Sequence, residues 1–251
     1  MTTARGHTIQ INDIEIYYDV HGTGKPLLLL HGFGGCTKNW NPFIPVLSEH
    51  YQLIVVDLRG HGHSTNPRNT FTHREAAVDV FLLLDKLGID HFSAIGISSG
   101  GMTLLHMATS QPNRIDSMVL ISATSHFPDQ ARDIMRAASF AKMPQEVQEM
   151  YRECATRGDE QIRQLITQFN ALSKNYDDMN FTTESLSTIT ARTLIVHGDR
   201  DRFFPVEIPE NISRSIRDAT LWIISGGEHV PIYDTTIPFI TRALRFLNKE
   251  L

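Results

Sequence analysis

Short, unbroken apolar runs recur along this chain, and they limit its possible folds more than any other feature. Each run has the length of a β-strand: Leu27–Leu30, Leu53–Val56, Ser93–Ile97, Met118–Ile121, Thr193–Val196 and Leu221–Ile224. Strands without a polar face belong in parallel sheets that helices cover on both sides. The runs therefore predict a mostly parallel sheet at the centre of the fold.

Helical patterns lie between these runs, and a hairpin precedes them. From Ala77 to Leu87 the apolar residues follow helical spacing, and Gly88 is placed to end that helix. Residues 237–247 show the same spacing near the C-terminus. Alternating isoleucines flank the Asn12-Asp13 pair, a pattern typical of a hairpin turn. Strands that alternate with helices favour an open α/β sheet.

One long stretch, from His126 to Thr190, contains no convincing strand. Helix-prone pieces lie at about 129–141, 145–156 and 160–172. A structureless loop of this length is uncommon inside a compact domain. We expect residues 126–190 to form a helical cap, inserted between the two parts of a core domain at 1–125 and 191–251.

Composition excludes several classes of function. The formal net charge is −5, and charges of both signs are scattered without a basic block, so no nucleic-acid partner is expected. No apolar run reaches the roughly 20 residues that span a bilayer, and the first residues lack a signal-peptide pattern. We therefore expect a cytoplasmic protein without a membrane partner. Cys36 and Cys154 could pair, but no disulfide framework is expected in such a chain, and we expect Cys36 to be buried and unreactive.

Gly96-Ile97-Ser98-Ser99-Gly100 follows one of the apolar runs and precedes a helix-like segment. This is the G-x-S-x-G pattern at the strand-to-helix junction that a nucleophile elbow requires. A sharp turn there would expose the Ser98 hydroxyl, which makes Ser98 the candidate nucleophile. A glycine- and serine-rich connection without chemistry would show the same five residues, so the rest of the chain must decide.

A nucleophilic serine needs a base, and the base needs an orienting acid. In folds with such an elbow these residues follow in the order Ser, Asp or Glu, then His. His229 is the only histidine beyond Asp201, so it is the candidate base. Asp199 and Asp201 both follow the run at Thr193–Val196, and their spacing alone does not choose between them.

Four motifs in this order resemble the α/β-hydrolase family, and the resemblance covers nearly the whole chain. They are His31–Gly35 with Trp40 beyond it, Asp57–Ser64, Gly96–Gly100, and Gly198–Pro205 paired with Gly227–His229. The resemblance implies an eight-stranded, mostly parallel sheet with a helical cap. In the family pattern G-x-x-D-x-x-x-P the aspartate is the triad acid, and this favours Asp201 over Asp199.

The resemblance also assigns further parts of a site. The oxyanion hole would use the backbone N–H groups of Phe33 and Ser99. The Asp57–Ser64 stretch would be a scaffolding turn, and a metal site there is not expected. We further expect the substrate pocket to include His126, Phe140, Met143 and Val230. Other adaptable or aromatic side chains of the predicted cap suit such a pocket equally well: Met135, Met150, Phe169, Met179 and Phe181.

The resulting hypothesis is a serine hydrolase that cleaves carboxylic esters of small, partly apolar substrates through an acyl-enzyme, with water as the co-substrate and no cofactor. Haloalkane dehalogenases and epoxide hydrolases of this family use an aspartate at the elbow, where this chain has Ser98. Four alternatives keep the same triad: a C–C bond hydrolase acting on dienoates, an enol-lactonase, a cofactor-free haloperoxidase or perhydrolase, and a ligand receptor derived from a hydrolase. The oligomeric state is not predicted.

Overall fold

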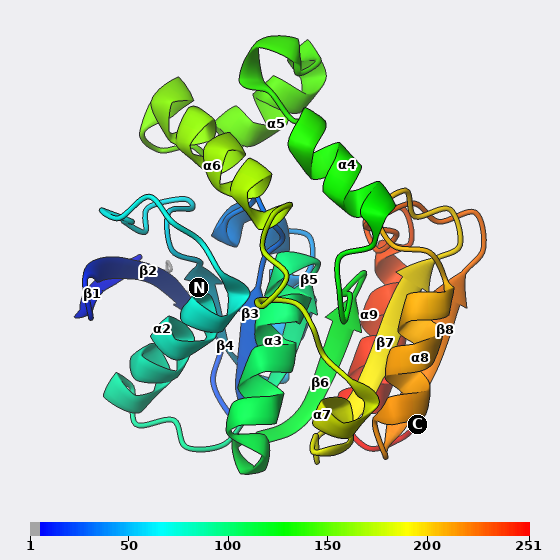
Figure 1. The fold of residues 1–251 in the computed structure, drawn as a ribbon. Coiled ribbons are helices and arrows are strands. Elements are labelled where there is room, and N and C mark those ends of the chain that lie inside the picture. Colours follow the sequence, from blue (N-terminus) through cyan, green and yellow to red (C-terminus); the bar gives the residue numbers. More distant parts are fainter. Residues whose placement is uncertain (1–5) are drawn as a thin grey trace.

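An eight-stranded sheet forms the centre of the computed structural model, which describes residues 6–251 (Figure 1). The strands are β1 His7–Ile11, β2 Ile14–His21, β3 Pro26–Leu30, β4 Gln52–Asp57, β5 Phe92–Ile97, β6 Ile115–Ile121, β7 Arg192–Gly198 and β8 Ala219–Ile224. Their order in the sheet is β1-β2-β4-β3-β5-β6-β7-β8. Antiparallel pairing joins β1 to β2 and β2 to β4, and the remaining neighbours are parallel.

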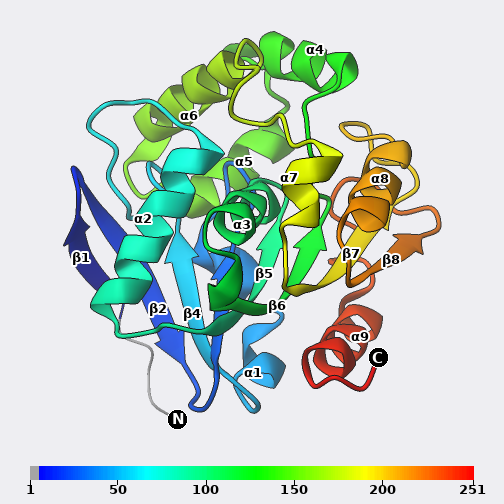
Figure 2. The same cartoon turned by 60° about the horizontal axis from the view of Figure 1, so that its bottom comes forward.

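Helices cover both faces of the sheet. The α-helices of the described residues are α1 Ile44–Leu47, α2 His73–Lys86, α3 Ser99–Ser110, α4 Asp129–Ala137, α5 Gln145–Cys154, α6 Gly158–Leu172, α7 Thr183–Ser187, α8 Glu207–Ser215 and α9 Thr236–Leu247. Figure 2 shows α2, α3 and α8 on one face, with α1 and α9 on the other. The predicted α/β fold with a mostly parallel eight-stranded sheet is confirmed.

The apolar runs are continuous because the sheet has a core on each face. Leu28 and Leu30 of β3 pack into the core beneath α2 and α3, while Leu27 and Leu29 pack into the core beneath α1 and α9. Successive side chains of a strand point to opposite faces, so both sets must be apolar. Each such leucine, fully buried, stabilises the fold by about 1.5–3 kcal/mol.

Three helices, α4 to α6, lie above the carboxyl ends of the parallel strands (Figure 1). Residues 173–190 then return along the core, where α7 packs against α8. Side chains of α6 and the turn before it hold this region down, because Gln161 and Arg157 donate hydrogen bonds to the carbonyl oxygen of Gly60. Helices α4 to α6 therefore cover the carboxyl ends of the strands. The exact limits of a cap at 126–190 stay a prediction.

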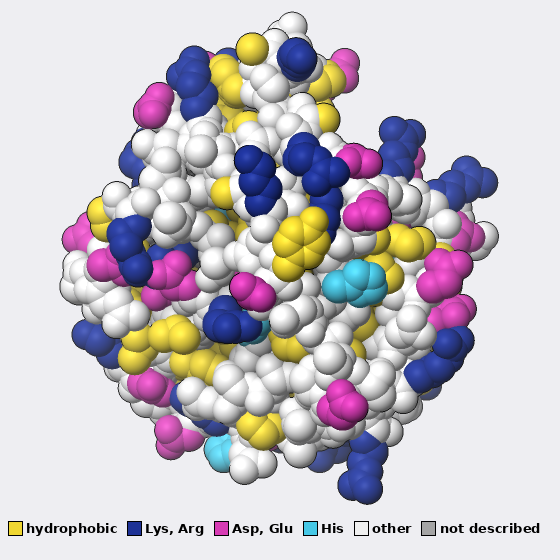
Figure 3. Space-filling model, in the orientation of Figure 1, with side chains coloured by type: hydrophobic (Ala, Val, Ile, Leu, Met, Phe, Trp, Pro, Cys, Tyr) yellow, Lys and Arg dark blue, Asp and Glu magenta, His cyan; other side chains and the backbone are white. Residues whose placement is uncertain are grey.

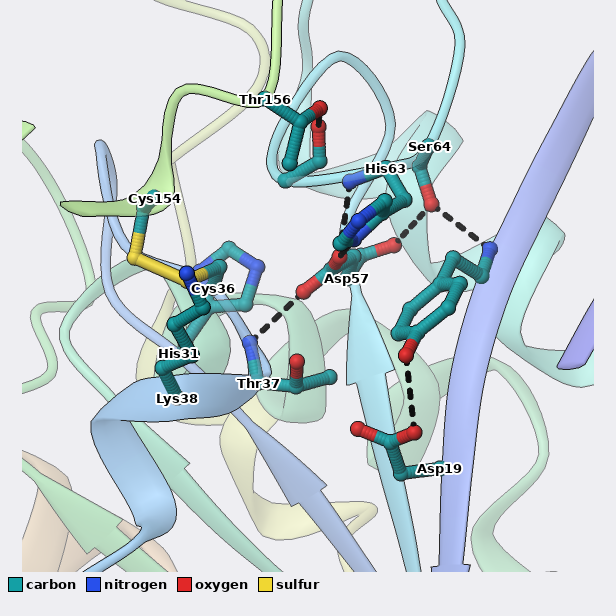
Figure 4. Close-up of polar contacts among 12 residues, drawn as sticks. Asp19, His31, Cys36, Thr37, Lys38, Asp57, His63, Ser64, Cys154 and Thr156 are labelled. Carbon is teal, nitrogen blue, oxygen red and sulfur yellow. Dashed lines mark hydrogen bonds and ion pairs between the residues drawn. A yellow bond between two sulfur atoms is a disulfide. The ribbon is translucent and has the colours of Figure 1, made fainter. Parts of the chain in front are cut away.

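Cys36 and Cys154 form a disulfide, so the expectation of unpaired cysteines was wrong. Their Cα atoms lie 5.5 Å apart although 118 residues separate them in the chain. Only the folding of α5 back over the loop after β3 brings them together, which spacing along the sequence does not reveal. The bond ties α5 to the core (Figure 4).

Charges of both signs are mixed on the face of the molecule that Figure 3 draws, where Lys and Arg side chains are interspersed with Asp and Glu. Within residues 6–251, no helix has the combined length and hydropathy needed to cross a bilayer.

Candidate active site

Ser98 occupies the turn between β5 and α3. Its backbone angles, φ 48° and ψ −111°, lie in a region that residues other than glycine rarely adopt. Strand and helix meet closely beneath it: a Cβ added to Gly96 would lie 2.5 Å from the carbonyl carbon of Gly100. A Cβ on Gly100 would lie 2.2 Å from the carbonyl oxygen of Leu30. The glycines of the motif are therefore required by the close approach of backbone to backbone.

The structure brings Ser98, His229 and Asp201 together at the carboxyl edge of the sheet. Nε2 of His229 lies 3.0 Å from Oγ of Ser98, and its Nδ1 lies 2.8 Å from Oδ2 of Asp201. Asp201 follows β7 and His229 follows β8, so neighbouring parallel strands deliver the acid and the base. This chain of contacts lets the imidazole accept the hydroxyl proton while the carboxylate stabilises the imidazolium.

Of the two candidate acids, Asp201 is the one that contacts the imidazole. Its Oδ1 also accepts hydrogen bonds from the N–H groups of Phe203, at 2.7 Å, and Phe204, at 3.1 Å. Burial raises the pKa of Asp201, but the hydrogen bonds from His229 and the backbone outweigh it and hold that pKa below its usual value. Asp199 instead accepts from the N–H of Gly226 at 2.7 Å and braces two loops.

Two backbone N–H groups lie beside Ser98. Ser99 is the first residue of α3, so its N–H has no partner within the helix. The loop of Gly32 and Phe33 passes close to the elbow, because a Cβ on Gly32 would lie 3.5 Å from the Cβ of Ser98. His31 holds this loop: its Nδ1 donates to the carbonyl of Gly32 at 2.7 Å, and its Nε2 accepts from the N–H of Leu58 at 3.0 Å. The arrangement suits the binding of a developing oxyanion.

A second Ser–His–Asp chain lies one residue further along and was missed from the sequence. His73, at the start of α2, contacts Oγ of Ser99 through Nε2 at 3.1 Å and Oδ2 of Asp178 through Nδ1 at 2.6 Å. All three side chains are buried. The Ser99 side chain thus points away from the nucleophile, as expected, and it contacts His73, which Asp178 in turn orients.

The Asp57–Ser64 turn acts as a brace beside the oxyanion loop (Figure 4). Oδ1 of Asp57 accepts from the N–H of Thr37 at 2.6 Å, and Oδ2 accepts from the N–H of His63 at 2.9 Å. The Ser64 hydroxyl donates to the carbonyl of Asp57 at 2.6 Å. The turn is stabilised by its own hydrogen bonds, and it connects the loop after β3 to the loop after β4.

Above Ser98 lies a cavity of about 340 Å³, within the range of small-molecule sites. Its lining is mostly apolar and comes from the elbow, the loop after β7 and helices α4 to α6. The polar residues that line it are Ser98, Ser99, Tyr151 and His229. Among the described residues that line it there is no lysine, arginine, aspartate or glutamate.

The cavity is lined by some of the residues that the sequence suggested for a pocket and not by others. Val230 lines the cavity, as do Met135, Met150 and Phe169. His126, Phe140 and Met143 do not. His126 is exposed and borders a different surface hollow with Thr183 and Arg214. The ring of Phe140 packs against the guanidinium groups of Arg152 and Arg163, and Met143 follows the short turn Phe140–Lys142.

Met179 and Phe181 also lie outside the pocket, because residues 173–190 descend along the core. The pocket side chains that sequence reasoning missed are Ile97, Met102, Phe127, Val147, Tyr151, Leu172, Phe203 and Phe204. Phe203 and Phe204 lie within the Gly198–Pro205 motif, so their closeness to Asp201 could have indicated that they border the site. The sequence carries no comparable indication of which face of α5 points into the cavity.

Comparison with known proteins identifies the family of this fold. The family profile described as alpha/beta hydrolase fold matches residues 25–173. A soluble epoxide hydrolase of Corynebacterium sp. (strain C12) is 34% identical over an alignment that spans 46% of this chain and 40% of that relative. A pimeloyl-[acyl-carrier protein] methyl ester esterase of Legionella pneumophila (strain Paris) is 25% identical, over 94% of this chain and 100% of that relative.

A solved structure of a meta-cleavage product hydrolase variant from Pseudomonas fluorescens IP01 superposes with a TM-score of 0.81. It shares 22% identity and covers 98% of each chain. Identity at that level supports the fold alone. The profile match covers more than half of the sequence and includes the elbow and the loop after β3. The chain therefore belongs to the α/β-hydrolase fold family.

Proposed function

We propose that this protein is a serine hydrolase that cleaves uncharged carboxylic esters of small, partly apolar substrates. The observation that carries the proposal is the contact chain Ser98–His229–Asp201, which opens into an apolar cavity beside the N–H groups of Phe33 and Ser99. Residues 126–190 act as the cap, since α4 to α6 supply the upper wall of that cavity.

The mechanism follows from the contacts. Ser98 Oγ attacks the ester carbonyl as Nε2 of His229 takes the hydroxyl proton, and Asp201 stabilises the imidazolium through Nδ1. The N–H groups of Phe33 and Ser99 donate to the tetrahedral oxyanion. His229 then protonates the departing alcohol, and a water molecule, activated by the same imidazole, releases the acid from Ser98.

The lining of the cavity favours an ester over a dienoate among the proposed substrates. A dienoate carries a carboxylate, and a buried anion requires a cation or several donors to offset its lost hydration. No arginine or lysine among the described residues borders this cavity. Lactone hydrolysis and perhydrolysis use the same machinery and remain the second candidates, because a lactone and hydrogen peroxide are both uncharged.

Repeated turnover of a substrate would distinguish an enzyme from the alternative of a ligand receptor. The decisive experiment compares the protein with its Ser98→Ala variant on p-nitrophenyl butyrate, a lactone, a dienoate and the butyrate with added peroxide. We expect repeated turnover of the butyrate and its loss in the variant, with thermal stability unchanged. Binding without turnover, or full activity of Ser98→Ala, would overturn the proposal.

The disulfide bears on where this function is exercised. Disulfides persist in oxidising compartments and are rare where glutathione and thioredoxin keep thiols reduced. The bond between Cys36 and Cys154 thus counts against the cytoplasmic location that the sequence suggested. We propose an oxidising compartment, tested by alkylating free thiols in freshly lysed cells and measuring the fraction of the chain that resists labelling.

A further inference from the structure

Tyr151 is the feature of the cavity that the catalytic steps leave unused. It borders the cavity from α5, and it is the one polar side chain of the α4–α6 segment that does so among the residues described. Every other cap residue of the lining is apolar: Met135, Val147, Met150, Phe169 and Leu172.

The hydroxyl of Tyr151 is available to a ligand. Burial raises the pKa of Tyr151 to about 12, and no hydrogen bond contributes to that shift. The phenol therefore keeps its proton at neutral pH, and it has no protein acceptor within residues 6–251. The side chain is only partly buried, so its hydroxyl reaches the cavity and can donate a hydrogen bond to a ligand acceptor there.

The ring of Tyr151 packs against Gly34 of the loop after β3, and this contact fixes its position. A Cβ on Gly34 would lie 2.5 Å from Cε1 of Tyr151 and 2.8 Å from its hydroxyl oxygen, so the ring packs directly against the glycine backbone. Gly34 also has φ +79°, which itself favours glycine. The phenol thus lies next to Phe33, whose N–H is the proposed oxyanion donor.

Two further contacts hold the same turn of α5 against the same loop. Cys154, one helical turn after Tyr151, forms the disulfide with Cys36 (Figure 4). Nζ of Lys38 donates to the carbonyl of Glu153 at 2.8 Å. Residues 151–154 are therefore fixed to residues 34–38 at three points, and a covalent bond is one of them.

Resting on the proposed ester hydrolysis, we infer that Tyr151 is a specificity-determining residue that donates a hydrogen bond to a second acceptor atom of the substrate, and that the Cys36–Cys154 disulfide holds it in place. The substrate class is then an uncharged ester with an ether, hydroxyl or keto oxygen near the scissile carbonyl. An ester with a hydrocarbon chain at that point fits the pocket but leaves the phenol unpaired.

The test uses two ester pairs that differ by one oxygen in place of a methylene. On the acyl side, p-nitrophenyl methoxyacetate is compared with p-nitrophenyl butyrate; on the alcohol side, 2-methoxyethyl butyrate is compared with n-butyl butyrate. The preference for the ether ester, as a ratio of kcat/KM, is measured for the parent and for Tyr151→Phe. Dividing the preference of the parent by that of the variant cancels the difference in intrinsic reactivity between the two esters of a pair.

We expect Tyr151→Phe to reduce that preference by roughly tenfold in one of the two pairs, since an unpaired buried acceptor costs about 1–3 kcal/mol and tenfold corresponds to about 1.4 kcal/mol. The phenylalanine keeps the ring against Gly34, so packing is unchanged. Tyr176→Phe is the matched control, because Tyr176 lies outside the cavity and is exposed.

The double variant Cys36→Ser/Cys154→Ser tests the second half of the inference. It should lower the ether preference in the parent background and leave it unchanged in the Tyr151→Phe background. An ether preference that Tyr151→Phe leaves intact in both pairs overturns the inference, as does an equal fall in kcat for all four esters. If the parent hydrolyses none of the esters, or hydrolyses them without Ser98, the proposed function itself fails.

Discussion

Oδ2 of Asp178 lies 2.6 Å from Nδ1 of His73, and this buried pair joins the segment after α6 to the first turn of α2. Asp178 also accepts hydrogen bonds from the backbone N–H groups of His73, at 2.9 Å, and Arg74, at 3.1 Å. Since His73 in turn contacts Ser99, whose N–H is a proposed oxyanion donor, the carboxylate links the return from the cap to the catalytic elbow.

The first prediction concerns this carboxylate. Burial raises the pKa of Asp178, but the contacts with His73 and the backbone N–H groups reverse that effect and lower it to about 2. A folded-state pKa below the ordinary value means that Asp178 stabilises the fold above about pH 4. That contribution disappears as the pH falls towards 2.

Asp178→Asn should therefore reduce the free energy of unfolding at pH 7 by about 3 kcal/mol, because it leaves a buried imidazole without its charged partner. The difference from the parent should shrink as the pH falls below 4. Urea denaturation at several pH values measures both effects. Asp177→Asn, one residue earlier and exposed, is the control, and a variant as stable as the parent at pH 7 would contradict the assigned role.

A second prediction separates the two aspartates after β7. Asp201→Asn replaces the carboxylate that contacts His229, and the comparable change in a serine protease lowers kcat about 10⁴-fold. Asp199→Asn affects only the bond to the N–H of Gly226, so its turnover should stay within about tenfold of the parent. Steady-state kinetics on p-nitrophenyl butyrate decide the matter, and the reverse ranking would exclude Asp201 as the orienting acid.

The sequence predicted the parts of the site that depend on local motifs at strand ends. Ser98 sits in a five-residue pattern, and Asp201 and His229 each follow a recognisable strand, so the parallel sheet itself brings them together. The choice of Asp201 over Asp199 came from the family resemblance, and the contact with His229 agrees with it.

Other parts of the site depend on where distant segments meet, which a single sequence does not contain. Cys36 and Cys154 lie 118 residues apart, and their pairing requires the path of α5 over the core. The His73–Asp178 contact spans 105 residues in the same way. In the amphipathic cap helices, periodicity predicts a buried face but does not say whether a cavity or another helix covers it. Phe140 was assigned to the pocket because aromatic side chains suit one, and the structure places it in a short turn against Arg152 and Arg163.

A third prediction follows from two buried histidines. Burial lowers the pKa of His61 to about 3 and that of His106 to about 4. Both are neutral in the folded protein, whereas in the unfolded chain they bind protons below about pH 6.5. The unfolded state therefore gains protons first, and the folded state loses stability as the pH falls from 6.5 to about 4.

Each of these histidines should contribute a loss of about 1.4 kcal/mol per pH unit within that interval. Chemical denaturation at pH 7, 6 and 5 measures the slope. His106→Asn should flatten it, while His91→Gln, at an exposed position, should leave it unchanged. Equal stability at pH 7 and pH 5 would show that His61 and His106 are not held neutral by the fold.

The last prediction concerns the disulfide as a structural bond. Cys36 and Cys154 close a loop of more than a hundred residues, and bonds of this kind typically stabilise a fold by about 2–4 kcal/mol, mainly by restricting the unfolded chain. Reduction of the parent with a dithiol should lower its urea midpoint to that of the Cys36→Ser/Cys154→Ser variant. The variant itself should not respond to the dithiol, which makes it the control for unrelated effects of the reductant. A parent whose midpoint is the same with and without the dithiol, although mass spectrometry shows complete reduction, would contradict a stabilising role, and the non-covalent contacts of α5 and α6 would then suffice to hold α5 over the active site.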